Sequence, residues 1–311
     1  MSWLERGRRG LFLLLLGLSC WPRVGPPLAL ASGVTLSMTL GNPWPRQTAQ
    51  WSKRLLQLSV VGLGFGLGLD QVWLAAKGAV LYTLIGIVLT ILLGRWLGAR
   101  LGTTPSTATL IAFGTAICGG SAIAAMAPVI RAEDDETAVA LATVFTLNAV
   151  ALILFPPLGH LLGLAPHAFG VWAALAIHDT SSVVGAAAAF GGGALAVATT
   201  IKLARALWIM PSALFAAWRT KSDGKVRFPL FILGFIAAAG VRSLLPQFAN
   251  LWESLHAVAR QGLVVTLLLI GLGLSRQMLQ RVGARPMLQG VLLWVIVGSA
   301  TLGAILVGWI G

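Results

Sequence analysis

Long apolar runs separated by short polar loops cover the whole chain, a pattern typical of a polytopic membrane protein. The runs predict about eleven helical segments, at roughly 11–22, 26–41, 54–69, 78–97, 106–130, 136–160, 167–190, 193–218, 228–245, 261–275 and 286–310. No long polar stretch is left over for a soluble domain. We therefore expect an all-α membrane protein in which residues 26–311 form a single multi-pass domain.

The first apolar run is short for a membrane span. Three arginines precede it, Arg6, Arg8 and Arg9, and a small-residue stretch, Ala29-Leu-Ala31, follows it. Residues 1–25 therefore fit either a short first helix or a cleaved signal peptide. The prolines at positions 22, 26 and 27 would break any single helix here, which favours a short helix and a new start.

Two segments carry glycine and polar residues where a membrane helix is normally most apolar. The first interruption is Cys118-Gly-Gly-Ser121 and the second is His178-Asp-Thr-Ser-Ser182. A broken helix leaves unpaired N–H and C=O groups, which are tolerated in a bilayer only where they line a cavity or bind something. Two breaks predict two discontinuous helices that meet near the bilayer midplane, as in many secondary transporters. Packing kinks are the alternative, and re-entrant segments fit the sequence as well as full spans.

The residues at the two breaks favour an anion site. Gly119 and Gly120 let a ligand approach the main chain, and we expect Ser121 to cap the half-helix that follows. Asp179-Thr-Ser181 supplies good caps for a second half-helix beginning near Ser182. A half-helix N-terminus offers free N–H donors and partial positive charge, which suit an anion.

Four ionisable residues lie inside apolar segments. Lys202 and Arg205 are three residues apart and share a helix face. Two such charges in a membrane need partners, and a substrate anion, Asp179 or the acidic cluster Glu133–Glu136 are the candidates. Snorkelling to an interface is the alternative. His178 and Asp179 suit proton coupling or a counter-charge, and equally a structural hydrogen bond and an N-cap.

Charge placement gives an orientation. The chain is 57% hydrophobic and only 10% charged, with a net charge of +13. If every segment crosses and the N-terminus is cytoplasmic, fifteen of the 22 Lys and Arg residues are cytoplasmic and five are outside. This bias follows the positive-inside rule and removes the need for a nucleic-acid partner. The two cysteines, Cys20 and Cys118, predict neither a disulfide nor a metal site.

A short sequence match suggests an internal repeat. Gly66-Leu-Gly-Leu69 recurs as Gly271-Leu-Gly-Leu274, and each precedes a long apolar helix. The matching helices are seven segments apart, so the repeat would be inverted. Residues of about 26–97 and 228–310 would then flank a core at 106–218.

Four runs of sequence resemble signatures of the YeiH-type family of bacterial membrane proteins, whose members are labelled sulfate exporters. These runs are Gly114–Ala125, Glu136–Asn148, Ala176–Ala187 and Thr199–Arg205. The resemblance covers about residues 26–310, although the first helix looks shorter than the family's. It implies a multi-pass inner-membrane protein with inverted repeats and crossed discontinuous helices. The predicted orientation places the N-terminus in the cytoplasm and the C-terminus in the periplasm.

The sequence therefore predicts a secondary transporter of a small anion, with sulfate or an organic sulfonate as first candidates. Arg205 would pair with the anion, Lys202 would set the local potential or move a proton, and Asp179 would hold one of these cations when the site is empty. The expected substrate ligands are Cys118, Gly119, Gly120, Ser121, Thr180, Ser181, Ser182 and Arg205, with His178, Asp179 and Lys202 in charge or proton coupling.

Several alternatives stay open at this point. Oxygens of Thr146 and Asn148 suit a coupling sodium ion, and a proton is the other coupling candidate. An ion channel or a cation/proton exchanger is the main rival function. A hydrolase triad of His178, Asp179 and either Ser181 or Ser182 lacks a nucleophile elbow, so an intramembrane enzyme is a remote alternative. We expect no cofactor, no metal and no nucleotide-binding loop; a homodimer fits the sequence as well as a monomer.

Overall fold

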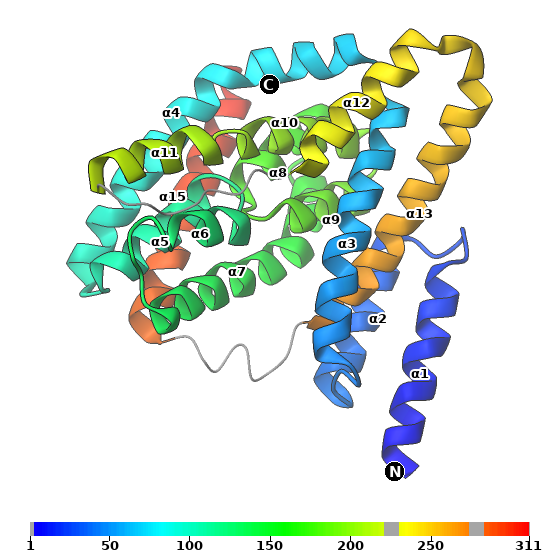
Figure 1. Ribbon diagram of the computed structural model, residues 1–311, viewed down its shortest axis with the longest axis horizontal. Helices are drawn as coiled ribbons and strands as arrows, with labels where there is room; N and C mark the ends of the chain where they lie inside the picture. Colours follow the sequence, from blue (N-terminus) through cyan, green and yellow to red (C-terminus); the bar gives the residue numbers. More distant parts are fainter. Residues whose placement is uncertain (1–2, 221–229, 274–282, 311) are drawn as a thin grey trace. The chain divides into compact units, whose positions relative to one another are not determined.

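The protein is helical throughout the part of the chain that the computed structural model describes, which is residues 3–220, 230–273 and 283–310 (Figure 1). Every regular element in these ranges is a helix, so the expected all-α class is confirmed. The chain divides into two compact units. The first unit combines residues 1–73 with 229–277, and the second combines 74–228 with 278–311.

Helix α13 (Ala249–Gly273) is the centre of the first unit. It packs against α1 (Trp3–Ser19), α2 (Pro26–Thr39) and α3 (Pro45–Leu63), while α12 (Leu230–Leu244) packs against α3. Two 3₁₀ turns, Gly64–Gly66 and Pro246–Phe248, complete the unit. Pro26 and Pro45 stand in the first turns of α2 and α3, where a missing N–H leaves no helical bond unmade.

The second unit contains nine helices among its described residues. They are α4 (Leu69–Leu101, whose first turn belongs to the first unit), α5 (Pro105–Ala116), α6 (Gly120–Met126), α7 (Asp134–Leu161), α8 (Pro166–Ala176), α9 (Thr180–Phe190), α10 (Ala194–Ala206), α11 (Ile209–Thr220) and α15 (Ala284–Leu306). Helix α7 packs against α5, α6 and α9, and α10 packs against α8 and α9. Helix α15 contacts α5, α7 and α8.

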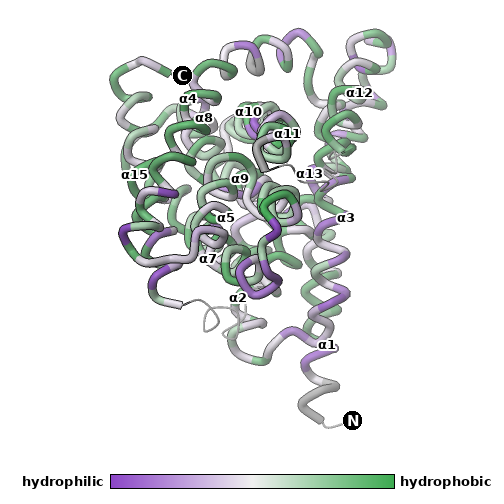
Figure 2. Tube along the Cα trace, turned by 60° about the vertical axis from the view of Figure 1, so that its left-hand side comes forward, coloured by the Kyte–Doolittle hydropathy of each residue, from purple (hydrophilic) through white to green (hydrophobic). Residues whose placement is uncertain are grey.

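Five helical stretches are long and apolar enough to cross a membrane. They are Val80–Leu101, Asp134–Leu161, Ala194–Trp218, Pro246–Gly273 and Ala284–Leu306. Figure 2 shows the mostly hydrophobic colouring of α8, α9 and α15 and the hydrophilic positions along α3. Large apolar side chains on α4 stay exposed, including Leu81 at 68% and Leu92 at 61%. An apolar surface of this extent is expected of a protein that faces lipid.

Helices α5 and α6 form a helical hairpin, which we call the first hairpin. Thr104, at the entrance to α5, donates its hydroxyl to Glu136 Oε1 at 2.6 Å, in the first turn of α7. A Cβ placed on Gly114 of α5 would lie 2.9 Å from Ile123 Cδ1 of α6. The chain thus returns to where it entered, and Figure 1 shows α7 starting beside the beginning of α5.

Helices α8 and α9 form a second hairpin. A Cβ placed on Gly192, just after α9, would lie 2.6 Å from Pro166 Cγ at the start of α8. The rings of Phe169 and Phe190 stack at 3.9 Å between centroids, and that of Phe190 also stacks on His160 near the end of α7. The two outer ends of this hairpin therefore also lie together. The sequence left open whether 106–130 and 167–190 run straight through or turn back, and the structure favours the second arrangement, because each segment reverses at its break.

The two hairpins share one layout at a spacing of 60 residues. Helices α5 and α8 end at Ala116 and Ala176, and α6 and α9 begin at Gly120 and Thr180. Helices α7 and α10 begin at Asp134 and Ala194, again 60 residues apart. The expected repeat was a different one. Its Gly66 lies in the turn after α3 and its Gly271 in the last turn of α13, while Leu274 falls outside the described residues.

Two glycines allow α2 and α13 to touch backbone to backbone. A Cβ on Gly33 would lie 2.3 Å from the carbonyl oxygen of Leu268, and one on Gly271 would lie 2.6 Å from that of Leu30. Neither site has room for a methyl group, because backbone atoms cannot move aside as a flexible side chain can. Small residues at a helix contact are a common device of membrane proteins.

We predict that Gly271→Ala lowers the free energy of unfolding by about 1–3 kcal/mol, the usual cost of overpacking. Gly273→Ala is the matched control, since a Cβ there would meet nothing within 4 Å and alanine is the better helix former. Thermal unfolding in detergent, followed by tryptophan fluorescence, measures both. Equal melting temperatures for the two variants would show that α2 and α13 do not pack closely.

Candidate functional site

The tips of the two hairpins meet each other. Residues 117–119 connect α5 to α6 and residues 177–179 connect α8 to α9. Gly119 has φ of +66°, a conformation that side chains rarely adopt, and a Cβ there would lie 3.1 Å from Asp179 Cβ. Glycine is thus required at this position for two reasons, backbone conformation and contact. The meeting of Gly119 and Asp179 places both breaks in one region of the second unit.

Two buried cations of α10 bind the carbonyl ends of the helices that lead into the tips. Lys202 Nζ donates to the carbonyl oxygens of Ile177 at 2.7 Å and Ala174 at 3.3 Å. Arg205 donates from Nε to Ala116 O and from Nη1 to Leu175 O, both at 2.6 Å.

Arg205 therefore joins the last turns of α5 and α8. The C-terminal carbonyls of a helix carry partial negative charge, which a cation offsets. Both side chains are almost fully inaccessible, Lys202 at 0% and Arg205 at 2% exposure. These contacts offset part of the cost of burying two like charges.

The second tip is completed by an amide from α7. Asn148 Oδ1 accepts from the backbone N–H groups of His178 and Asp179, both at 3.2 Å. Asp179 is the N-cap of α9, as predicted, and its carboxylate accepts from the backbone N–H and the hydroxyl of Ser181. The positive end of α9 thus already holds an anion, which is the chain's own carboxylate.

Several predicted contacts take a different form. Ser121 does not cap α6, because the helix begins at Gly120 with Gly119 as its N-cap, and Ser121 is exposed in the first turn. Helix α9 begins at Thr180 rather than near Ser182. The amide oxygen of Asn148 already accepts two N–H groups, so it is not available to a sodium ion.

The predicted ion pair between Asp179 and α10 is replaced by hydrogen bonds. Asp179 bonds Ser181, while Lys202 and Arg205 bond carbonyls. Lys202 nevertheless acts electrostatically on Asp179, and both cations of α10 act on His178. Of the remaining candidates, Cys118 and Ser182 are buried at their tips, and Ser181 is half-buried. Gly120 packs toward α7, where a Cβ would lie 2.8 Å from Phe145 Cζ.

Several buried hydrogen-bonding groups without a partner belong to the tips or to the helices that contact them, and other such groups lie elsewhere in the described residues. On α5, α7, α10 and the second tip these groups are Thr115 Oγ1, Thr146 Oγ1, Thr199 Oγ1, Asn148 Nδ2 and both ring nitrogens of His178. None of these side chains is more than 8% exposed. Buried polar groups in native proteins are nearly always paired, and each unpaired one costs about 1–3 kcal/mol. The set is therefore suited to a polar ligand or to water.

Sequence reasoning missed two members of this set, Thr115 and Thr199. Thr115 precedes Ala116, whose carbonyl Arg205 binds. Thr199 lies three residues before Lys202 on α10 and so shares its helix face. Threonine is common in apolar helices, where its hydroxyl usually bonds the carbonyl four residues earlier, as Thr143 does. The absence of that bond at Thr199 is visible only in three dimensions.

Comparison with known proteins identifies the family. A family model described as "Conserved hypothetical protein 698" matches residues 27–290. A UPF0324 membrane protein of Geobacter sulfurreducens is 55% identical over 302 residues, which are 97% of each chain. One of Bdellovibrio bacteriovorus is 50% identical, over 93% of this chain and 91% of its own. One of Bacteroides thetaiotaomicron is 48% identical, over 92% and 88%.

The chain belongs to the UPF0324 family of membrane proteins. This match confirms the resemblance to the YeiH-type family that the four sequence runs indicated. The names of these three UPF0324 relatives describe membrane proteins and mention no substrate. No solved structure matches the chain significantly.

We predict that Arg205→Lys destabilises the protein although it keeps the charge. One ammonium group on a shorter, differently shaped side chain cannot hold Ala116 O and Leu175 O as the guanidinium does. The loss of one charge-assisted hydrogen bond corresponds to about 1.5–3 kcal/mol. Arg100→Lys is the control, because Arg100 is exposed and contacts the ring of Trp96. Melting temperatures in detergent compare the two; an unchanged value for Arg205→Lys would exclude the bridging role.

Proposed function

We propose that the protein is a secondary transporter of a small anion that works by alternating access, with sulfate or an organic sulfonate as first candidates. One observation carries the proposal: two buried cations and one carboxylate contact the paired tips, and the tips and the helices packed on them carry buried hydrogen-bond donors that lack partners. With all three groups ionised, this region carries one net positive charge. An anion that accepts hydrogen bonds would satisfy both the excess charge and the unpaired donors.

The arrangement in the membrane follows from the hairpins. We infer that both are re-entrant and enter from opposite faces, because α7, a helix long enough to span, lies between them. The other nine predicted segments would cross, and the hairpin tips would meet near the midplane. The two hairpins, each with the helix that follows it, would then be inverted repeats. Their backbone breaks would be shielded inside the protein, as a bilayer requires. The N-terminus would be cytoplasmic and the C-terminus periplasmic in the bacterial inner membrane.

Different residues would bind the anion, set the electrostatic potential and take up the coupling proton. Thr199, Thr146 and the Nδ2 group of Asn148 would donate hydrogen bonds to the anion. Lys202 and Arg205 would supply positive potential while they remain bound to the hairpin carbonyls. Asp179 occupies the positive end of α9, so it competes with the substrate there and is the natural group for proton coupling.

Cysteine labelling tests the membrane arrangement. In a Cys20→Ser background, His167→Cys should react with a membrane-impermeant maleimide in intact cells, since His167 is exposed near the start of α8. Asp135→Cys should react only after permeabilisation, because the first hairpin returns the chain to the cytoplasmic side. Full spans would instead place Asp135 outside. Labelling of Asp135→Cys in intact cells would therefore contradict the re-entrant first hairpin.

Anion binding tests the function. The purified protein would be screened for thermal stabilisation by sulfate, sulfonates, phosphate, nitrate and chloride. Sodium and potassium salts of each anion would be compared. The flux of any anion that stabilises the protein would then be measured in proteoliposomes. Thr199→Val should weaken binding and flux of that anion about tenfold, the loss of one hydrogen bond of roughly 1.4 kcal/mol. It should not lower the stability of the ligand-free protein, because the hydroxyl has no partner there.

Thr143→Val is the matched control. Thr143 is equally buried in the second unit, and its hydroxyl bonds Val139 O within α7. This variant should bind the anion like the wild type. Stabilisation by cations alone would overturn the anion proposal in favour of a channel or cation exchanger. Equal anion binding by Thr199→Val and the wild type would remove Thr199 from the site.

A further inference from the structure

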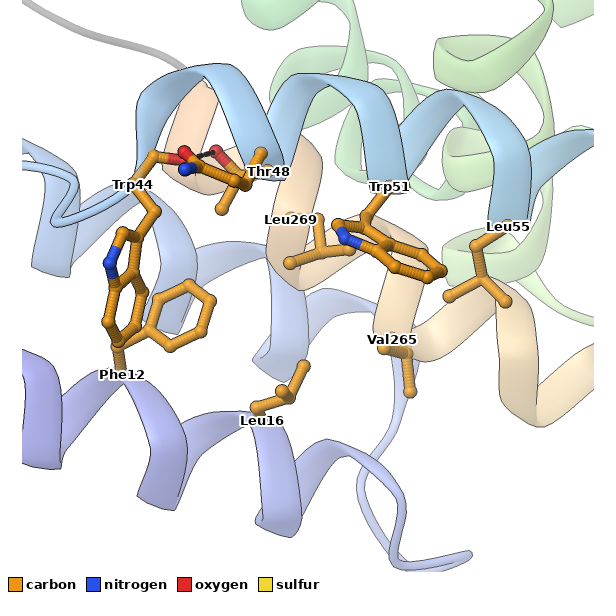
Figure 3. A pocket seen from close by; sticks show the side chains of 9 residues that line it. Phe12, Leu16, Trp44, Thr48, Trp51, Leu55, Val265 and Leu269 are labelled. Atoms are coloured by element: carbon orange, nitrogen blue, oxygen red, sulfur yellow. Dashed lines mark hydrogen bonds between the residues drawn. The ribbon is translucent and has the colours of Figure 1, made fainter.

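The first unit contains an apolar pocket that is separate from the hairpin tips. Its volume is about 430 Å³, and it lies between α1, α3 and α13. Figure 3 shows Phe12 and Leu16 of α1 facing Trp51 and Leu55 of α3, with Leu269 of α13 at the back. Almost all of its lining is hydrocarbon or aromatic. A flexible apolar group fits such a space, and a charged solute does not.

Positive charge gathers at one end of this pocket. The guanidinium of Arg9 lies 5.5 Å from the ring centroid of Trp44, which lines the pocket and packs edge-on against Phe12. Arg8 Nη1 contacts the carbonyl oxygen of Leu40 at 3.5 Å, at the turn that leads to Trp44. Arg46 is exposed in the first turn of α3. Arg9 thus contacts a ring of the pocket lining, and Arg8 and Arg46 belong to or contact the segments on either side of Trp44.

We propose that this pocket binds one anionic phospholipid, with an acyl chain inside and the headgroup phosphate at Arg8, Arg9 and Arg46. A single ligand that is apolar along its length and anionic at its end matches the two parts of the site. The predicted orientation puts these arginines on the cytoplasmic side, where a basic pocket between membrane helices suits an anionic headgroup. Trp44 and Trp51 would lie at headgroup level, where tryptophan is enriched. The lipid would hold α1, whose only larger contacts among the described helices are with α2 and α13.

Native mass spectrometry of the detergent-solubilised protein tests this site. The protein would be titrated with phosphatidylglycerol, with phosphatidylcholine of the same chains, and with glycerol phosphate as the free headgroup. We expect one tightly held phosphatidylglycerol, weaker phosphatidylcholine and no retained glycerol phosphate. Arg9→Gln should weaken phosphatidylglycerol about fivefold, since one basic residue near the surface contributes roughly a factor of five. Arg100→Gln is the matched control, because Arg100 also lies over a tryptophan ring, 5.2 Å from that of Trp96.

A second pair of variants tests the apolar part. Leu16→Trp should fill the pocket and displace the lipid, whereas Leu13→Trp, at an exposed position of α1, should not. Equal melting temperatures of the lipid-free variants would show that both fold. Equal binding of the two lipids would overturn the headgroup assignment. Binding of glycerol phosphate would overturn the acyl-chain assignment. Full retention of phosphatidylglycerol by Leu16→Trp would show that the lipid does not occupy this pocket. None of these outcomes depends on anion transport, which the second unit would carry out.

Discussion

The structure of the second unit depends on the contact between two cations of α10 and the carbonyl ends of two interrupted helices. An interrupted helix in a bilayer leaves acceptors that neither water nor lipid can satisfy. Arg205 meets this need for α5 and α8 at once, and Lys202 adds two further carbonyls of the second hairpin. The cations also gain from the contact, because a buried charge without partners would be far more costly. The cations and the carbonyl groups thus lower each other's cost of burial. Because Arg205 bonds both hairpins, the same contacts hold the two tips together.

Three kinds of side chain satisfy the hydrogen-bonding groups at the breaks. Cations of α10 bind the C-terminal carbonyls, the Asn148 amide of α7 binds N–H groups of the second tip, and Asp179 caps α9. The first tip has no side-chain cap and relies on Gly119 instead, whose positive φ turns the chain directly into α6. The backbone groups named here therefore have partners without a ligand. What remains unmet is a set of side-chain groups, which is where a transported ion would find partners.

Much of this could be read from the sequence, and the limits have physical causes. Apolar runs identify membrane helices because a bilayer imposes their length, and glycine with capping residues marks the breaks. Whether the chain crosses or reverses at a break depends on contacts such as Thr104 with Glu136, whose residues are 32 positions apart. Hydropathy contains no trace of such a contact, and both arrangements leave most loops on the same side. The spacing of Lys202 and Arg205 shows that they share a face, but not that backbone carbonyls lie opposite.

The occupied end of α9 constrains how an anion could move through the proposed site. Asp179 already provides the negative charge that this helix end favours, so a second anion at the same place would meet like-charge repulsion. Protonation of Asp179 would remove that repulsion, and it would at the same time weaken the N-cap of α9. Substrate entry, proton uptake and loosening of the second tip would then be one linked event, whereas the first tip, capped by Gly119 alone, would not respond. The two hairpins, alike in layout, would in this way differ in function because only one of them carries an ionisable cap.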